Sequence, residues 1–223
     1  MSAALFSGDK KLPMMTLLAK WERKFIDRNV SRFPHWLQGY HLTLLTIPWS
    51  AGLIAFGWLA GSNLAWLWLS SLMLFLQWFT DCFDGALGKS RDTGIPKWGY
   101  YMDHFLDFVF MCTIFIGYSF LVEGTNRTLV FLLIPVFGCF MASSFLSFGA
   151  TGEFKITYLG AGPTEIRIAF IVLNTLIICF GAGWIEKLLV YILILAVIFL
   201  FVVAYRTQAY IWKIDMQDKA NRR

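Results

Sequence analysis

The sequence has little charge. Only 15% of its 223 residues are Asp, Glu, Lys or Arg, whereas a soluble domain typically has about a quarter. This scarcity argues against a soluble globular protein. Apolar residues make up 58% of the chain and fall in long blocks. Because a helix of about 20 apolar residues is long enough to cross a bilayer, the composition predicts a polytopic membrane protein.

Cysteine is also scarce, and no two of the four cysteines have the spacing of a metal site. They lie in or beside apolar blocks, where we interpret them as small apolar side chains. The sequence has no internal repeat and no low-complexity run, and its polar N-terminus shows no cleavable signal peptide. We therefore expect a single domain over residues 1–223.

Six apolar segments have about the length that a membrane-spanning helix requires. They cover residues 42–60, 64–80, 100–121, 128–150, 165–182 and 187–205. The expected fold is therefore an all-α membrane bundle of six transmembrane helices over about residues 42–205.

Residues 14–30, which precede the first span, predict an amphipathic helix. Apolar residues recur there at helical spacing, and basic residues fill the other positions. The apolar residues are Leu17, Leu18, Trp21, Phe25 and Ile26, and the basic residues are Lys20, Arg23, Lys24 and Arg28. Such a helix would lie in the headgroup layer and contact membrane lipids; the alternative is a solvated N-terminal helix.

The basic residues favour one side of the predicted bundle. All Lys and Arg residues except Arg127 and Lys187 fall before the first span, in the loops after the second and fourth spans, or in the tail. The positive-inside rule then places both termini in the cytoplasm. Since the charge follows the predicted membrane faces, we expect no nucleic-acid partner. The short chain and its lack of a targeting segment favour a bacterial inner membrane.

Four aspartates lie inside or next to these apolar segments, where a carboxylate is costly and points to a functional site. Asp81 and Asp84 are three residues apart, and the helix of the second span is expected to continue through them to Lys89. Asp103 and Asp107 are four residues apart in the third span. Residues at these spacings share a helix face, and the short loop between the two helices makes them antiparallel neighbours. The four carboxylates are therefore expected to converge.

Such a cluster predicts divalent metal ions. Carboxylates packed together repel one another unless a cation neutralises them, and hard oxygen ligands suit Mg²⁺ or Mn²⁺. Two such ions could hold a diphosphate and stabilise the charge that develops in a displacement. The alternative for Asp81 and Asp84 alone is that they end a helix and face water.

Glycines and cations accompany the acids. Gly85 and Gly88 follow the first two aspartates by four residues, and Gly99 precedes Asp103 by four. A glycine leaves room for a ligand to approach the helix backbone. Lys89 and Arg91 would supply positive charge to phosphate oxygens. The pattern as a whole indicates metal-assisted phosphoryl transfer.

In order and spacing these residues resemble the motif of the CDP-alcohol phosphotransferases (CDP-alcohol phosphatidyltransferases), membrane enzymes of phospholipid synthesis. The family's motif is D-x2-D-G-x2-A-R-x8-G-x3-D-x3-D, and the chain has Asp81-x2-Asp84-Gly85-x2-Gly88-Lys89-x9-Gly99-x3-Asp103-x3-Asp107. Gly88 and Lys89 stand where the family has alanine and arginine. The linker is one residue longer, so Arg91 could take the place of the arginine.

The resemblance implies roles for the acids. Asp81, Asp84 and Asp103 would ligate the metals, and Asp107 would act as a metal ligand and as the general base. The enzyme would move a phospho-alcohol or phosphatidyl group from a CDP-linked donor to an alcohol acceptor and release CMP. A homodimer is also expected by resemblance.

The resemblance also implies a CDP site. Gly85, Gly88 and Gly99 would line it, together with Lys89 or Arg91. The family has a P-N-x-L-T-like stretch near the cytidine on the first span, of which this chain keeps only Leu42 and Thr43. Thr43 is therefore a further candidate for this site; the alternative is an ordinary threonine near a helix start.

The substrates are less defined. His104 follows Asp103 directly, which resembles the aminoalcohol branch and favours a choline or ethanolamine head group. The alternative is a CDP-diacylglycerol-dependent enzyme with serine, inositol phosphate or glycerol phosphate as acceptor. Lys155 and Arg167 could bind the phosphate of an acceptor, or could be interfacial anchors. Two other classes stay open: a cation transporter that uses the aspartates, and a non-catalytic relative.

Overall fold

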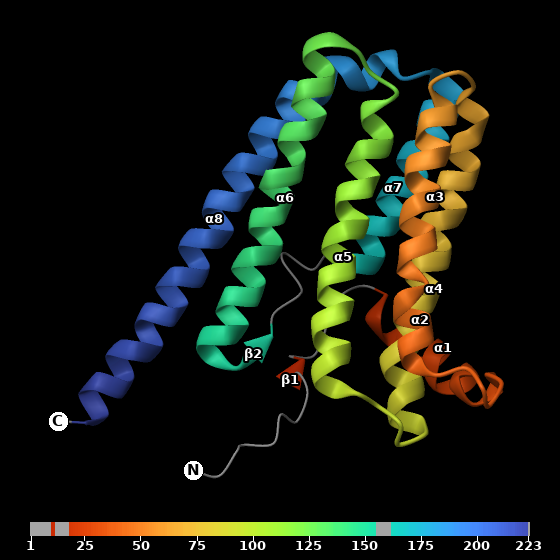
Figure 1. Cartoon of the computed structure of the whole chain (residues 1–223). Coiled ribbons are helices and arrows are strands. Elements are labelled where there is room, and N and C mark those ends of the chain that lie inside the picture. Colours follow the sequence, from red (N-terminus) through yellow and green to blue (C-terminus); the bar gives the residue numbers. More distant parts are fainter. Residues whose placement is uncertain (1–9, 12–17, 155–161, 223) are drawn as a thin grey trace.

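The computed structural model describes residues 10–11, 18–154 and 162–222 (Figure 1). Nearly all of this part of the chain is helical. Two strands of two residues each, β1 (Lys10–Lys11) and β2 (Glu153–Phe154), pair in parallel. The predicted all-α bundle is therefore confirmed as a helical fold, apart from this short bridge.

The helices are α1 (Ala19–Asn29), η1 (Val30–Arg32), α2 (Gly39–Leu44), α3 (Thr46–Ala60), η2 (Leu64–Trp66), α4 (Leu67–Ser90), α5 (Pro96–Ser119), α6 (Gly124–Thr151), α7 (Pro163–Phe180) and α8 (Gly183–Asn221). Each of the six predicted spans corresponds to one helix, except that the first is divided between α2 and α3 and the second between η2 and α4. Helix α4 continues past the apolar segment through both of its aspartates, as predicted. Helix α8 continues well beyond the predicted end at residue 205, because its polar C-terminal part is helical too.

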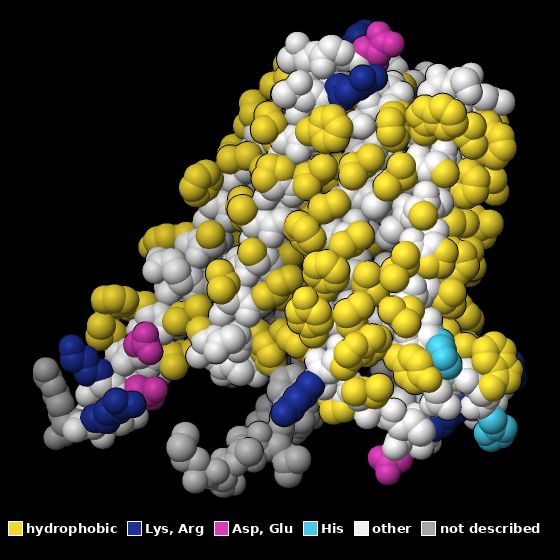
Figure 2. All heavy atoms as spheres, in the orientation of Figure 1, with side chains coloured by type: hydrophobic (Ala, Val, Ile, Leu, Met, Phe, Trp, Pro, Cys, Tyr) yellow, Lys and Arg dark blue, Asp and Glu magenta, His cyan; other side chains and the backbone are white. Residues whose placement is uncertain are grey.

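Four helical segments are long and apolar enough to cross a membrane. They are Gly39–Ala60, Gly124–Thr151, Pro163–Phe180 and Gly183–Asn221. Helices α4 and α5 fall outside this group because their polar residues lower their mean hydropathy. Figure 2 shows hydrophobic side chains over the middle of the bundle and charged side chains at its two ends. Length, composition and surface thus indicate an integral membrane protein.

Helix α3 lies at the side of the bundle opposite α8 (Figure 1). It packs against both α4 and α5, while α7 covers α4, α6 covers α5, and α8 lies beside α6 (Figure 1). The contact between α3 and α5 is close because a Cβ on Gly57 would lie only 2.5 Å from the Cα of Gly117.

In the described residues α4 and α5 run antiparallel, and their backbones lie farther apart than the backbones of α3 and α5. Their side chains nevertheless meet, since Gln77 on α4 donates a hydrogen bond to Asp107 on α5 and Asp81 joins Asp103 and Asp107. The two helices are therefore antiparallel neighbours, as predicted.

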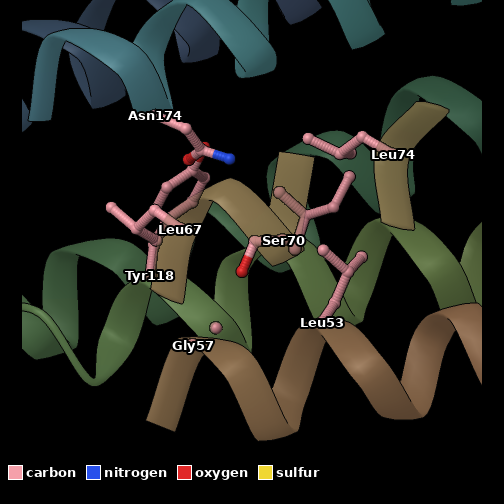
Figure 3. A pocket seen from close by; sticks show the side chains of 9 residues that line it. Leu53, Gly57, Leu67, Ser70, Leu74, Tyr118 and Asn174 are labelled. Atoms are coloured by element: carbon pink, nitrogen blue, oxygen red, sulfur yellow. The ribbon is translucent and has the colours of Figure 1, made fainter. Parts of the chain in front are cut away.

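A polar network ties α4, α5 and α7 together inside the bundle. The Tyr118 hydroxyl donates to Asn174 Oδ1 (2.8 Å), and Asn174 Nδ2 donates to Ser71 Oγ (3.0 Å). Beside it lies a cavity of about 10 Å³, lined in part by Ser70 and Gly57 (Figure 3). A space of this size holds about one water molecule. The cavity is therefore far too small for a nucleotide, and the substrate site has to lie elsewhere.

Helix α1 lies against the outside of α4 and α7. Glu22 accepts hydrogen bonds from Trp78 Nε1 (3.4 Å) on α4 and from Thr164 Oγ1 (2.5 Å) on α7. Phe25 stacks on Trp78 and meets the edge of Phe83. Of the predicted helix over residues 14–30, the part from Ala19 to Asn29 is helical, and residues 14–17 lie outside the described residues.

Candidate active site

Three of the four predicted acids converge between α4 and α5. One carboxylate oxygen each from Asp81, Asp103 and Asp107 can be chosen so that all three lie within 4.8 Å of one another. Asp81 comes from α4, and the other two lie one turn apart on one face of α5. All three are half-buried. A set of carboxylates this compact, made of hard oxygen donors only, fits a divalent cation such as Mg²⁺.

The fourth acid, Asp84, is held toward helix α2. Its Oδ2 accepts a hydrogen bond from Thr43 Oγ1 (2.7 Å), and its Oδ1 accepts one from the backbone N–H of Gly85. Helix α2 lies directly on α4 here, since a Cβ on Gly39 would clash with the carbonyl oxygen of Asp84. The structure therefore brings Thr43 to the aspartate motif through Asp84, while Asp84 lies outside the cluster of three.

Arg167 on α7 supplies the positive charge beside the cluster. Its Nη2 lies 2.9 Å from Asp81 Oδ2 and 3.6 Å from Asp107 Oδ1. The residue is buried, with 8% of its surface exposed, so it is not an interfacial anchor. A guanidinium in this position offsets part of the repulsion among the carboxylates. Lys155, the other cation considered for a phosphate, lies outside the described residues.

Gln77 on α4 is a site residue that the sequence analysis did not identify. Its Nε2 donates to Asp107 Oδ1 (3.1 Å), and 1% of its surface is exposed. The signal was present in the sequence, because Gln77 precedes Asp81 by four residues and therefore shares its helix face. A polar amide at that position in an apolar helix is costly unless it has a partner.

The predicted glycines divide into two kinds. A Cβ added to Gly85 or to Gly99 would meet no atom within 4 Å, so both border open space. Gly88 is buried, and a Cβ there would lie 3.2 Å from the Cα of Gly94. The first two leave room for a ligand, whereas Gly88 allows the connection between α4 and α5 to pack on the helix.

The two candidate cations also differ. Lys89 is exposed at the end of α4. The guanidinium of Arg91 instead donates to four backbone carbonyls, including those of Phe33 (2.8 Å) and Leu37, and so anchors the segment before α2. Arg91 therefore has a structural role here, and Lys89 is the one whose ammonium faces solvent.

His104 lies behind the cluster. Its Nδ1 is 3.3 Å from Asp103 Oδ2, and its ring packs on Tyr100 and Phe145 with centroids 4.3 Å and 5.3 Å away. A buried imidazole beside a carboxylate is typical of groups that orient a metal ligand.

The sequence matches the family model of the CDP-alcohol phosphatidyltransferases over residues 40–213. This match covers well over half of the chain, so the protein belongs to that family. No curated protein and no solved structure gives a significant match. The family consists of transferases of substituted phosphate groups that use a divalent metal, a CDP-alcohol donor and an alcohol acceptor. The protein is therefore an enzyme of this class. The three clustered aspartates all belong to the motif that the sequence shares with the family.

Proposed function

We propose that the protein transfers a phospho-alcohol or phosphatidyl group from a CDP-linked donor to an alcohol hydroxyl at the aspartate cluster, with release of CMP. The observation that carries this proposal is the convergence of Asp81 from α4 with Asp103 and Asp107 from α5 within 4.8 Å. The acceptor oxygen forms a bond to the phosphorus distal to cytidine, and the bond from that phosphorus to CMP breaks.

The aspartates would hold two divalent cations, Mg²⁺ or Mn²⁺. Asp81, Asp103 and Asp107 form the compact part of the ligand set, and Asp84 completes it from the side of α2. When bound, the cations supply positive charge for the diphosphate and for the CMP leaving group. Asp84 remains oriented by Thr43 in this arrangement, which positions its carboxylate at the edge of the cluster.

Asp107 would also take the proton of the attacking hydroxyl. A general base has to lie within hydrogen-bond reach of the proton that it removes. Asp107 lies one turn farther along α5 than Asp103, and Gln77 and Arg167 both approach its Oδ1. A lipid alcohol or a lipid donor that enters from the bilayer could meet it there.

The open sides of Gly85 and Gly99 would receive the CDP moiety, with Thr43 beside them and Lys89 free to contact a phosphate oxygen. Gly88 and Arg91, also predicted to line this site, would support it indirectly. Gly88 lets the connection between α4 and α5 pack closely on α4, and Arg91 holds the segment before α2 through hydrogen bonds to its carbonyls.

Two donor classes fit this site. The Asp103-His104 pair resembles that of the aminoalcohol branch of the family, which favours CDP-choline or CDP-ethanolamine as donor. Arg167 favours the second class, in which CDP-diacylglycerol reacts with a polar acceptor such as glycerol phosphate or inositol phosphate. Its guanidinium lies close enough to the acids to meet an acceptor's phosphate.

All six predicted spans would cross the membrane, α4 and α5 included. Their polar residues are tolerable because α3, α6 and α7 cover them. The connection between α4 and α5 and the C-terminal end of α8 lie at the same end of the bundle (Figure 1). We place that end, the active site and both termini in the cytoplasm of a bacterium, with the bundle in its inner membrane and a homodimer as the assembly.

Release of CMP by the purified protein tests this proposal and separates the donors. The assay compares CDP-diacylglycerol plus polar alcohols with CDP-choline or CDP-ethanolamine plus diacylglycerol, each with Mg²⁺ or Mn²⁺. We expect CMP from one donor class only. If metal binds but no donor yields CMP, the protein is a non-catalytic relative, and flux of a cation through vesicles would then favour a transporter.

A further inference from the structure

Gln77 is a buried amide for which the proposed chemistry has no role. It lies on α4 with 1% of its surface exposed, and its Nε2 donates to Asp107 Oδ1 at 3.1 Å. Its Oε1 has no hydrogen-bond partner among the described residues. A buried amide oxygen without a donor is unfavourable. An apolar side chain would fill this position without leaving an unpaired oxygen. The presence of Gln77 is therefore explained by its hydrogen bond to Asp107 and not by packing.

The two oxygens of Asp107 have different surroundings. Oδ1 accepts the hydrogen bond from Gln77 and lies 3.6 Å from Arg167 Nη2. In the described part of the chain Oδ2 accepts no hydrogen bond. One oxygen is therefore held by the protein, and the other is available to a ligand.

Without such a contact the carboxylate would be poorly oriented. The terminal torsion of an aspartate joins an sp³ carbon to an sp² carbon, and its energy profile is broad. Gln77 supplies a neutral donor from a rigid helix, so it fixes this torsion and adds no charge to the cluster. Arg167 lies farther from Oδ1 and is directed mainly at Asp81 Oδ2, 2.9 Å away.

We propose that Gln77 is a positioning residue: its hydrogen bond to Oδ1 turns the Asp107 carboxylate so that Oδ2 faces the acceptor hydroxyl and the cations. This inference rests on the proposed function, in which Asp107 removes the hydroxyl proton. Gln77 itself touches neither the substrate nor the reacting atoms in this arrangement.

The test uses Gln77→Met, which keeps the length and burial of the side chain but loses the donor. Loss of an outer hydrogen bond to a metal-site residue typically costs about 10–100-fold. We expect kcat for CMP release to fall by this factor and KM for the CDP donor to change little. Mn²⁺ affinity, measured by electron paramagnetic resonance, should fall in the same direction.

Two control variants separate positioning from packing. Gln208→Met makes the same change at an exposed site on α8, and Asn174→Leu removes another fully buried amide, away from the acids. Asn174→Leu should lower the melting temperature and leave kcat unchanged. If Gln77→Met keeps the wild-type kcat, or loses activity only as far as it loses folded protein, the proposal is wrong.

Mn²⁺ affinity in the Asp107→Asn background shows whether Gln77 acts through Asp107. We expect Gln77→Met to change nothing further there, and an equal loss in both backgrounds would contradict the proposal. If the wild-type protein released no CMP from any donor, the proposed function would fail. The Mn²⁺ affinities of the single and double variants would then still decide whether Gln77 orients Asp107.

Discussion

Helices α4 and α5 differ from α6 and α8 in a way that separates chemistry from membrane contact. Helix α8 buries only Leu189 and Val203, and side chains such as Phe201 (71% exposed) cover its outer face. Helix α4 buries polar residues, among them Gln77 and Thr80, and carries two of the acids. By length and composition α8 could cross a membrane, whereas α4 does not meet the same criterion.

The difference in polar content between α4 and α5 on one hand and α6 and α8 on the other follows from what surrounds each pair of helices. A charged group facing lipid is costly, so the helices at the edge of a membrane bundle have to be apolar. The helices at its centre are covered by their neighbours and can carry carboxylates if a cation or a donor accompanies them. High mean hydropathy therefore identifies helices that face lipid, such as α6 and α8. The less apolar helices α4 and α5 are the ones that carry the site.

The largest expected effect is the loss of activity when an aspartate on α4 or α5 is changed. Asp107→Asn keeps the shape of the side chain but removes the base, so kcat for CMP release should fall about 10²–10⁴-fold. Asp215→Asn makes the same change on α8 and should leave kcat roughly unchanged. Equal kcat values for the two variants would contradict the claim that the chemistry lies on α4 and α5 and not on α8.

A smaller effect, on stability, is expected from Arg167. Arg167→Met leaves Asp81 and Asp107 without their cation, and breaking a buried ion pair by removing one partner costs about 3–5 kcal/mol. In chelator the variant should therefore melt below the wild type. Mg²⁺ should raise its melting temperature more than that of the wild type, because bound cations replace the lost charge.

The matched control for this variant is Arg206→Met on α8, where the side chain is exposed. Surface changes of this kind are usually worth about 0.5 kcal/mol or less. Identical melting of Arg167→Met and Arg206→Met in chelator would mean that the ion pairs seen at the cluster contribute nothing to stability.

The smallest effect is expected at the edge of the site. Thr43→Val keeps the volume but loses the hydrogen bond to Asp84, and a bond to a charged group contributes about 1.5–3 kcal/mol. We expect kcat/KM for the CDP donor to fall roughly tenfold or more. Thr43→Ser keeps the hydroxyl and should retain most of the activity; a wild-type value for Thr43→Val would remove Thr43 from the site.

The sequence predicted what depends on neighbours along the chain. The helical segments, the continuation of α4 through its aspartates and the shared face of Asp103 and Asp107 all follow from local composition and from a period of 3.6 residues. The family resemblance rests on the same local spacing, and the match over residues 40–213 confirms it.

What the sequence left undetermined depends on contacts between distant segments. The position of Arg167 beside Asp81 requires α7 to pack on α4, and no spacing rule predicts that packing. Arg91 was considered for a phosphate, but its donors are taken by carbonyls more than fifty residues earlier. Asp84 shares a helix face with Asp81, yet it accepts a hydrogen bond from Thr43 and lies outside the cluster of three.

The central claim is that the aspartate cluster performs a metal-dependent transfer. Its most direct test is CMP release by the wild-type protein, with the preferred donor and acceptor, before and after chelation and after Mg²⁺ or Mn²⁺ is restored. We predict that CMP release stops in the chelator and returns with either cation. Undiminished release in the chelator, from metal-free protein, would contradict the account.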